Sequence, residues 1–216
     1  VMNDQQRSAS RGGPGAVMGS KKLKAIAVRG TQDIRAAKPS EYFASMNELL
    51  DTCKSHFITG SLLPKYGVTG IMGMMNEKGV LPTMNHSTGN FPGANDISGQ
   101  KMAETMLTKT RGCFCCTIHC TRVINIEHGP YFGTRGKGPD YDSAVAFGSQ
   151  CGNNDLEAIA RANLWCDQYG LDTVSTGATI AWAMELYEKG IINDEDTHGV
   201  RLNWGNHEAM TSMVPK

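Results

Sequence analysis

Apolar side chains recur at intervals of three and four residues along most of the chain after Ser40, which is the spacing of one face of an α-helix. The four helices expected from this pattern cover residues 41–53, 99–110, 156–169 and 178–187. The first three are each preceded by side chains that commonly cap helix starts: Ser40, Ser98, and either Asn154 or Asp155. Gly170 stands where a helix commonly ends. The pattern predicts a mainly helical chain.

Alternation of apolar and polar side chains, the spacing of a half-buried strand, is confined to short stretches. One strand is expected over residues 23–28, ending at Gly30, and another over residues 121–126. A hairpin-like return through Gly138 follows the second strand. The charged, proline-containing residues 32–39 predict a linker or a domain boundary.

The composition narrows the class of protein. Acidic and basic residues balance at 21 each, so net charge favours neither a nucleic acid nor a membrane surface as partner. No apolar run approaches the roughly 20 residues that a membrane-spanning helix needs. Because the chain starts at Val1 and stops at Lys216, directly after a helix-like stretch, we expect an internal fragment of a longer protein.

Four of the seven cysteines fall within the eight residues 113–120. Cys113, Cys116 and Cys120 form a C-x2-C-x3-C set, which lets one loop point three thiolates at a common centre. Thiolates are soft ligands suited to iron–sulfur clusters or zinc. A disulfide framework is the poorer interpretation, since the cysteine count is odd and no signal peptide is visible. A thiol-rich chain of this kind is expected in the reducing cytoplasm.

Three cysteines are one ligand short of a complete zinc site or four-iron cluster. The candidate fourth ligands within the chain are Cys53, Cys115, Cys151, Cys166 and His119. The spacing has no second C-x2-C pair, so it favours a cluster over a zinc ribbon.

Two further stretches could carry chemistry. Residues 12–19 contain four glycines, which expose backbone N–H groups and let the backbone approach a phosphate, although a tight turn is the plainer alternative. Asp140 and Asp142 could supply an acid and a base near a metal, although a solvated turn would use the same residues.

Three stretches, taken in chain order, resemble the tungsten-containing aldehyde ferredoxin oxidoreductase family. They are the glycine-rich residues 11–21, the three spaced cysteines, and residues 167–173, which fit the family's D-x-x-G-L-D pterin-binding pattern. The match runs over nearly the whole chain. It implies a mainly α fold, in which residues 38–216 form the helical middle domain, incomplete at its C-terminus. Residues 1–37 would be the tail of the β-rich N-terminal pterin-binding domain.

The resemblance also implies roles for individual residues. Cys113, Cys116 and Cys120 would bind three irons of a [4Fe–4S] cluster, whose fourth ligand is expected outside this chain. Two pterins, with phosphates bridged by Mg²⁺, would be held by Ser10, Arg11, Gly12, Gly13, Gly15, Asp167, Gly170, Leu171, Asp172 and Thr173.

Among these residues, Asp167 would accept hydrogen bonds from the pterin amino and ring N–H groups. Where the family has Gly-Pro-Glu-Tyr-Glu beside the tungsten, this chain carries Asp140 and Asp142, each one methylene shorter, as the expected catalytic carboxylates.

The implied reaction is the oxidation of an aldehyde to a carboxylic acid at a tungsten or molybdenum bis-pterin, with electrons passing through the cluster to ferredoxin or another low-potential carrier. A tungsten-dependent benzoyl-CoA reductase-type subunit is the alternative enzyme, and a plain Fe–S electron-transfer module is the non-enzymatic alternative. The expected assembly is a homodimer or a subunit of a larger complex.

Overall fold

The computed structural model describes residues 2–3, 7–8 and 11–215. The first half of the chain contains β1 (Met2–Asn3), β2 (Arg7–Ser8), α1 (Pro14–Ser20), α2 (Pro39–Ser55), the π-helix η1 (Ile58–Leu62), α3 (Leu63–Tyr66), the 3₁₀-helix η2 (Val68–Ile71), α4 (Met72–Glu77) and α5 (Gly99–Thr105). The second half contains β3 (Leu107–Arg111), β4 (Thr121–Asn125), β5 (Arg135–Lys137), α6 (Tyr141–Phe147), the 3₁₀-helix η3 (Ser149–Cys151), α7 (Leu156–Tyr169), α8 (Thr173–Glu188) and α9 (His207–Met213). The mainly helical fold expected from the sequence is confirmed.

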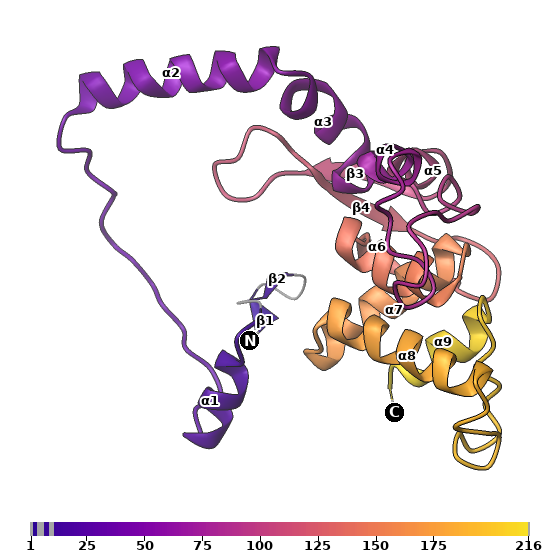
Figure 1. The fold of residues 1–216 in the computed structure, drawn as a ribbon. Coiled ribbons are helices and arrows are strands. Elements are labelled where there is room, and N and C mark those ends of the chain that lie inside the picture. Colours follow the sequence, from indigo (N-terminus) through magenta and orange to yellow (C-terminus); the bar gives the residue numbers. More distant parts are fainter. Residues whose placement is uncertain (1, 4–6, 9–10, 216) are drawn as a thin grey trace.

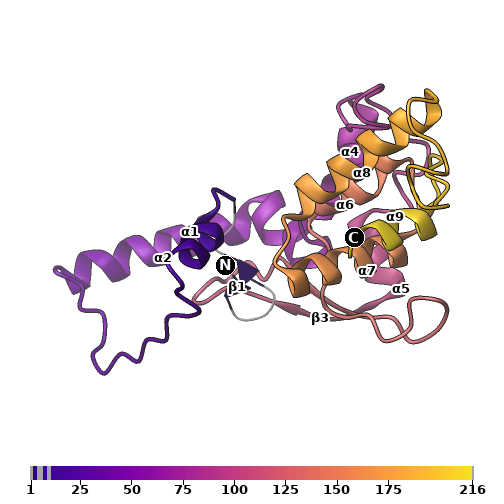
Figure 2. The same cartoon turned by 90° about the horizontal axis from the view of Figure 1, so that it is seen from below.

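The core of the molecule lies where α6, α7, α8 and α9 pack together (Figures 1 and 2). Residues 143–147 of α6 are all buried, and Phe147 is among the largest side chains with no exposed surface. Small residues on α7, such as Ala158 and Ala162, are completely buried and let neighbouring elements approach closely. The body is therefore centred on α6, the helix that follows Asp140 in the chain.

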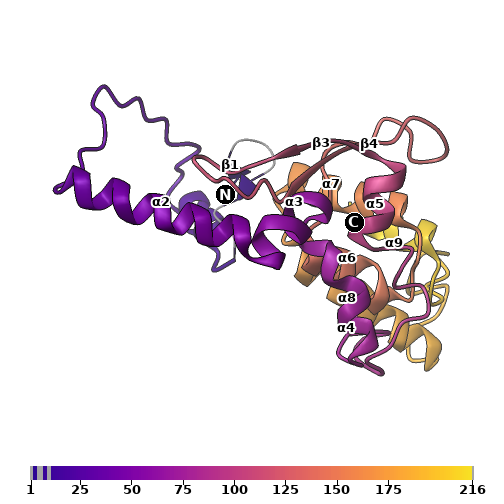
Figure 3. The ribbon, with the colours of Figure 1, turned by 90° about the horizontal axis from the view of Figure 1, so that it is seen from above.

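A three-stranded antiparallel sheet in the order β3-β4-β5 lies along one side of the helices (Figure 3). The predicted strand over residues 121–126 is confirmed as β4. The predicted helix after Ser98 is only partly correct, because α5 ends at Thr105 and residues 107–111 form β3. Ser98 does cap α5, by accepting a hydrogen bond from the Lys101 N–H. Pairing of β3 with β4, which begins ten residues further along the chain, overrides the helical spacing expected from Met102, Met106 and Leu107.

The predicted strand over residues 23–28 is wrong. These residues have no regular structure, and Ile26 and Val28 are 70% and 89% exposed. Among the described residues no strand pairs with them, and an unpaired strand leaves its backbone groups without partners. The preceding glycine-rich stretch forms the short helix α1 and not only a turn.

Helix α2 covers the predicted residues 41–53 but begins earlier, at Pro39, with Lys38 in place of Ser40 at the cap. Proline suits the first helical position because its fixed φ matches the helix and its missing N–H is not needed there. None of the α2 residues is buried, and the helix extends away from the body (Figures 1 and 3).

The start and end of α7 are as predicted. The Asp155 side chain accepts a hydrogen bond from the Ala158 N–H at 2.8 Å, and Gly170 ends the helix in the left-handed region at φ 71°. Helix α8 begins at Thr173, five residues before the predicted start, because Asp172 caps it. No described helix has both the length and the apolar character needed to span a bilayer.

Candidate functional site

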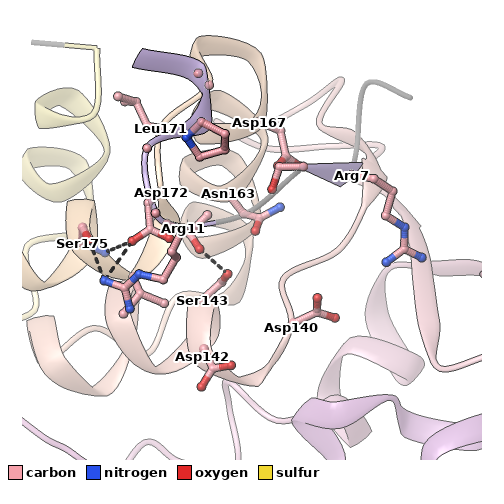
Figure 4. A pocket seen from close by; sticks show the side chains of 18 of the residues that line it. Arg7, Arg11, Asp140, Asp142, Ser143, Asn163, Asp167, Leu171, Asp172 and Ser175 are labelled. Carbon is pink, nitrogen blue, oxygen red and sulfur yellow. Dashed lines mark hydrogen bonds and ion pairs between the residues drawn. The ribbon is translucent and has the colours of Figure 1, made fainter. Parts of the chain in front are cut away.

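A pocket of about 940 Å³ opens between the N-terminal segment, the region around β5 and the start of α6, and the junction of α7 with α8 (Figure 4). It is lined by Arg7, Ser8, Arg11, Gly12, Gly13, Pro14, Gly15, Ala16, Lys137, Asp140, Asp142, Ser143, Asn163, Asp167, Gly170, Leu171, Asp172, Thr173, Val174 and Ser175. The lining thus joins segments that are more than 150 residues apart in the sequence.

Every described residue to which the family resemblance assigns pterin binding lies in this one pocket, and so do both expected catalytic aspartates. Ser10 lies outside the described residues. The three cysteines of the C-x2-C-x3-C set do not line the pocket. Their ligand role and the roles of the pocket residues stay predictions.

Arg11 links the N-terminal segment to the start of α8. Its guanidinium donates a hydrogen bond to the Ser175 hydroxyl at 2.9 Å and lies 3.4 Å from the Asp172 carboxylate (Figure 4). The same carboxylate accepts a hydrogen bond from the Ser175 N–H at 2.9 Å and caps the helix. Burial acts to raise the pKa of Asp172, but the hydrogen bonds from Ser175 and the charge of Arg11 outweigh it and lower that pKa below its ordinary value.

Two adjacent glycines allow the chain to turn into the pocket wall before α1. Gly12 and Gly13 have φ values of 104° and 73°, in a region that other residues rarely adopt. A Cβ atom at either position would meet nothing within 4 Å, so backbone conformation, and not crowding, requires glycine here.

Asp167 projects into the pocket from the last turn of α7 (Figure 4). Its Oδ2 atom is buried and has no hydrogen-bond partner. Burial raises the pKa of Asp167, and the charge of Asp140 adds to this, while Lys137 and Arg7 act in the opposite direction. A buried carboxylate oxygen without a donor is costly, so this atom is suited to a ligand that brings N–H groups.

Asp140 lies at the cap position of α6, but its side chain makes no capping hydrogen bond. Instead it pairs with Lys137, whose ammonium group donates to the carboxylate at 2.5 Å. Asp142 follows in the first turn of α6 and is exposed. Next to it, the Ser143 hydroxyl donates to the Thr173 hydroxyl at 2.8 Å and joins α6 to α8.

Sequence reasoning missed six polar residues of the pocket: Arg7, Ser8, Lys137, Ser143, Asn163 and Ser175. Local spacing could have indicated two of them. Asn163 precedes Asp167 by four residues on α7, which places both on one helix face, and Ser175 follows Asp172 at the spacing of a helix cap. No comparable local signal marks Arg7, which donates to the Thr121 hydroxyl at 2.7 Å.

The cysteine loop connects β3 to β4. A turn joins the first two predicted ligands, with the Cys116 N–H donating to the Cys113 carbonyl at 3.0 Å. Within the part of the chain that the structure describes, no three His, Cys, Asp or Glu side chains are close enough to hold a single metal ion. A four-iron cluster takes each thiolate on a different iron, and three thiols on one loop suit that donor set.

The loop lies close to the pocket. Burial raises the pKa of the Cys120 thiol, and the negative charges of Asp140, Cys113 and Cys116 raise it further. The pocket residue Asp140 and the other two thiols therefore all act electrostatically on Cys120. Of the candidate fourth ligands, Cys151 is completely buried and its thiol donates to the Ala146 carbonyl, which fits a core residue.

Comparison with known proteins gives the family. Residues 45–216 match the family described as aldehyde ferredoxin oxidoreductase, domains 2 and 3, and residues 1–30 match its N-terminal domain. The two matches define the class of protein, an oxidoreductase that joins these domains. The chain belongs to the aldehyde ferredoxin oxidoreductase family, which confirms the resemblance seen in the sequence.

Two similar proteins are tungsten-containing aldehyde ferredoxin oxidoreductases, from Pyrococcus furiosus and Thermococcus kodakarensis. Each is 42% identical over 217 residues, which cover 100% of this chain and 35% of the relative. The chain therefore spans about a third of the length of these curated relatives. A solved structure, the active site complex BamBC of benzoyl coenzyme A reductase with 1,5-dienoyl-CoA, is similar with a TM-score of 0.67 and 28% identity, covering 95% of this chain and 32% of that chain.

Proposed function

We propose that this chain is part of an enzyme that oxidises an aldehyde to a carboxylic acid at a tungsten or molybdenum bis-pterin. Electrons would leave through a [4Fe–4S] cluster to ferredoxin or another low-potential carrier in the cytoplasm. We place the boundary between the pterin-binding tail and the helical domain near residue 37.

The observation that carries this proposal is the pocket, in which the glycine-rich segment and the α7–α8 junction meet. These are the two stretches that the family resemblance assigns to pterin binding, and Arg11 joins them through Ser175 and Asp172. An electron-transfer module has no need of such a pocket, so the non-enzymatic alternative leaves this arrangement without a purpose.

The residues present suit a pterin. The unpartnered Oδ2 atom of Asp167 would accept hydrogen bonds from the pterin amino and ring N–H groups, which satisfies a buried acceptor. Arg11 supplies a guanidinium, and Gly12 and Gly13 supply a close backbone approach, toward the pterin phosphates and their Mg²⁺. When bound, the tungsten or molybdenum cofactor supplies the two-electron oxidation chemistry.

Proton movement would fall to the aspartates of α6. Lys137 holds the Asp140 carboxylate on the pocket wall through their ion pair, so that carboxylate has a fixed position from which to accept a proton. Asp142 is exposed and could pass the proton to water. Cys113, Cys116 and Cys120 would bind three irons, with the fourth ligand supplied from outside this chain.

The similarity to the benzoyl coenzyme A reductase complex favours a second candidate, an active-site subunit that reduces an aromatic acyl-CoA. Both candidates use the same pocket and cofactors and differ in the substrate. They are distinguished by substrate screening and not by cofactor content.

The first experiment is elemental analysis of the full-length natural protein purified without oxygen. About four irons and one tungsten or molybdenum per chain would support the enzyme, since a [4Fe–4S] cluster contains four irons. Iron without either metal would leave the electron-transfer module, and zinc alone would contradict every redox function. Aldehyde-dependent reduction of a viologen dye would then support the first candidate, and activity only with an aromatic acyl-CoA would support the second.

A further inference from the structure

Arg122 is a buried cation beside the cysteine loop. It lies on β4, two residues after Cys120, and is only 3% exposed. Its guanidinium donates to the Pro64 carbonyl at 2.8 Å and to the His119 carbonyl at 2.6 Å. The third nitrogen, Nε, is buried and has no hydrogen-bond partner.

No carboxylate pairs with this charge among the described residues, since both acceptors of the Arg122 guanidinium are backbone carbonyls. Burying a charge without a counter-charge is costly, and arginine cannot escape the cost by losing its proton. Cys120 lies two residues before Arg122, and both residues border the same turn at Gly67. The structure therefore places a buried positive charge where the counter-charge would come from a thiolate or from something bound to it.

The same guanidinium fixes the backbone around Cys120. The preceding residue, His119, is held in the left-handed region at φ 55°, and its carbonyl is the shorter of the two Arg122 contacts. On the other side of the loop, a Cβ atom at Gly67 would lie 3.0 Å from the Cys120 carbonyl oxygen and 3.3 Å from the Arg122 Cγ. The Cys120 backbone and the Arg122 side chain are therefore both packed against the turn at Gly67.

We propose that Arg122 is a positioning residue for the iron–sulfur cluster, and that its buried charge offsets the negative charge of the thiolate-bound cluster and raises its reduction potential. This inference rests on the proposed function, because it requires a cluster on Cys113, Cys116 and Cys120. A bound cluster would gain one negative charge when it is reduced by one electron, which the tungsten or molybdenum pterin would supply. A fixed neighbouring cation stabilises that reduced form more than the oxidised form.

The test is a redox titration of the full-length protein, purified without oxygen, followed by the electron paramagnetic resonance signal of the reduced cluster. In Arg122→Gln we expect the ratio of reduced to oxidised cluster at a fixed potential to fall about tenfold, equivalent to about 59 mV for a one-electron couple. Arg122→Lys keeps the charge and is expected to stay within about threefold of the natural protein, equivalent to about 28 mV on the same scale.

Arg161→Gln is the matched control. Arg161 also donates to two loop carbonyls, those of Tyr131 and Phe132, at 3.0 and 2.8 Å, but it lies on α7 and away from the cysteine loop. Its loss is expected to affect stability and to leave the cluster potential unchanged. An unchanged potential in Arg122→Gln, or an equal shift in both glutamine variants, would overturn the proposal.

A measurement on the natural sequence keeps the proposal refutable even if both Arg122 variants fail to fold. Removing the iron with a chelator should lower the melting temperature, because it removes the counter-charge of a buried guanidinium. An equal melting temperature with and without iron would overturn the role of Arg122, although it would not contradict the binding of a cluster by the three cysteines. Natural protein that contains no iron would instead overturn the proposed function, and the Arg122 proposal with it.

Discussion

Gly177 on α8 packs directly against Ala146 on α6, and replacing it by alanine tests how tightly the two helices pack. A Cβ atom at this position would lie 2.7 Å from the Cβ and the carbonyl carbon of Ala146 and 2.8 Å from its carbonyl oxygen. Two of these three neighbours are backbone atoms, which cannot rotate away. One of the two helices must therefore shift to accept the added methyl group.

Two effects of opposite sign decide the magnitude. Alanine in place of a helical glycine gains about 0.5–1 kcal/mol of stability when nothing opposes it. Overpacking a close-packed core costs about 1–3 kcal/mol, and backbone neighbours place this site toward the upper end. We therefore expect Gly177→Ala to lower the free energy of unfolding by about 1–2 kcal/mol, which corresponds to a melting temperature about 2–8 °C lower for a chain of this size.

Calorimetric melting of the purified variant measures this change. Gly73→Ala on α4 is the matched control, because its added Cβ would meet only the Asn95 side-chain oxygen, at an ordinary 3.8 Å. That variant is expected to gain up to about 1 kcal/mol from helix propensity alone. If Gly177→Ala melts at or above the temperature of the natural protein, as the control should, the close approach of α6 and α8 is refuted.

Three further predictions concern ionisable groups. Burial raises the pKa of Asp167, so its charged form opposes folding as pH rises through the ordinary carboxyl range. Asp167→Asn should therefore melt at a higher temperature than the natural protein at pH 7 without cofactor, yet retain less pterin. A lower melting temperature of this variant would contradict the prediction. The pKa of Asp172 is lowered, so its stabilisation is present above the unfolded pKa and lost as pH falls through the lower folded value. Asp172→Ala should lower the free energy of unfolding by about 1 kcal/mol at pH 7. Denaturant titrations at a series of pH values should show this difference shrinking below about pH 4. A difference that stays constant with pH would show that the charge of Asp172 does not contribute. Burial raises the pKa of Cys151, and it raises the pKa of Cys166 to about 11. In native iron-free protein a thiol reagent, followed by mass spectrometry, should therefore label the exposed Cys113 well before Cys151 or Cys166. Equal labelling rates would refute the burial of Cys151 and Cys166.

The sequence alone determined features that depend on interactions within a few residues. The start of α7 at Asp155 and its end at Gly170 follow from a cap that bonds three residues ahead and from a backbone conformation that favours glycine. The spacing of the cysteines and the D-x-x-G-L-D pattern likewise need no knowledge of distant residues, and they were enough to indicate the family, which the matches over residues 45–216 and 1–30 confirm.

Tertiary structure alone decided the features that depend on distant partners. Residues 107–111 form a strand because β4 supplies their hydrogen-bond partners, and residues 23–28 form none because no described segment does so. Across the pocket Arg11 donates to Ser175, 164 residues away in the chain, and the buried Arg122 donates to the carbonyl of Pro64, 58 residues away. Such contacts join segments that no local pattern relates, so the sequence could name residues of the site but not the charges that surround them.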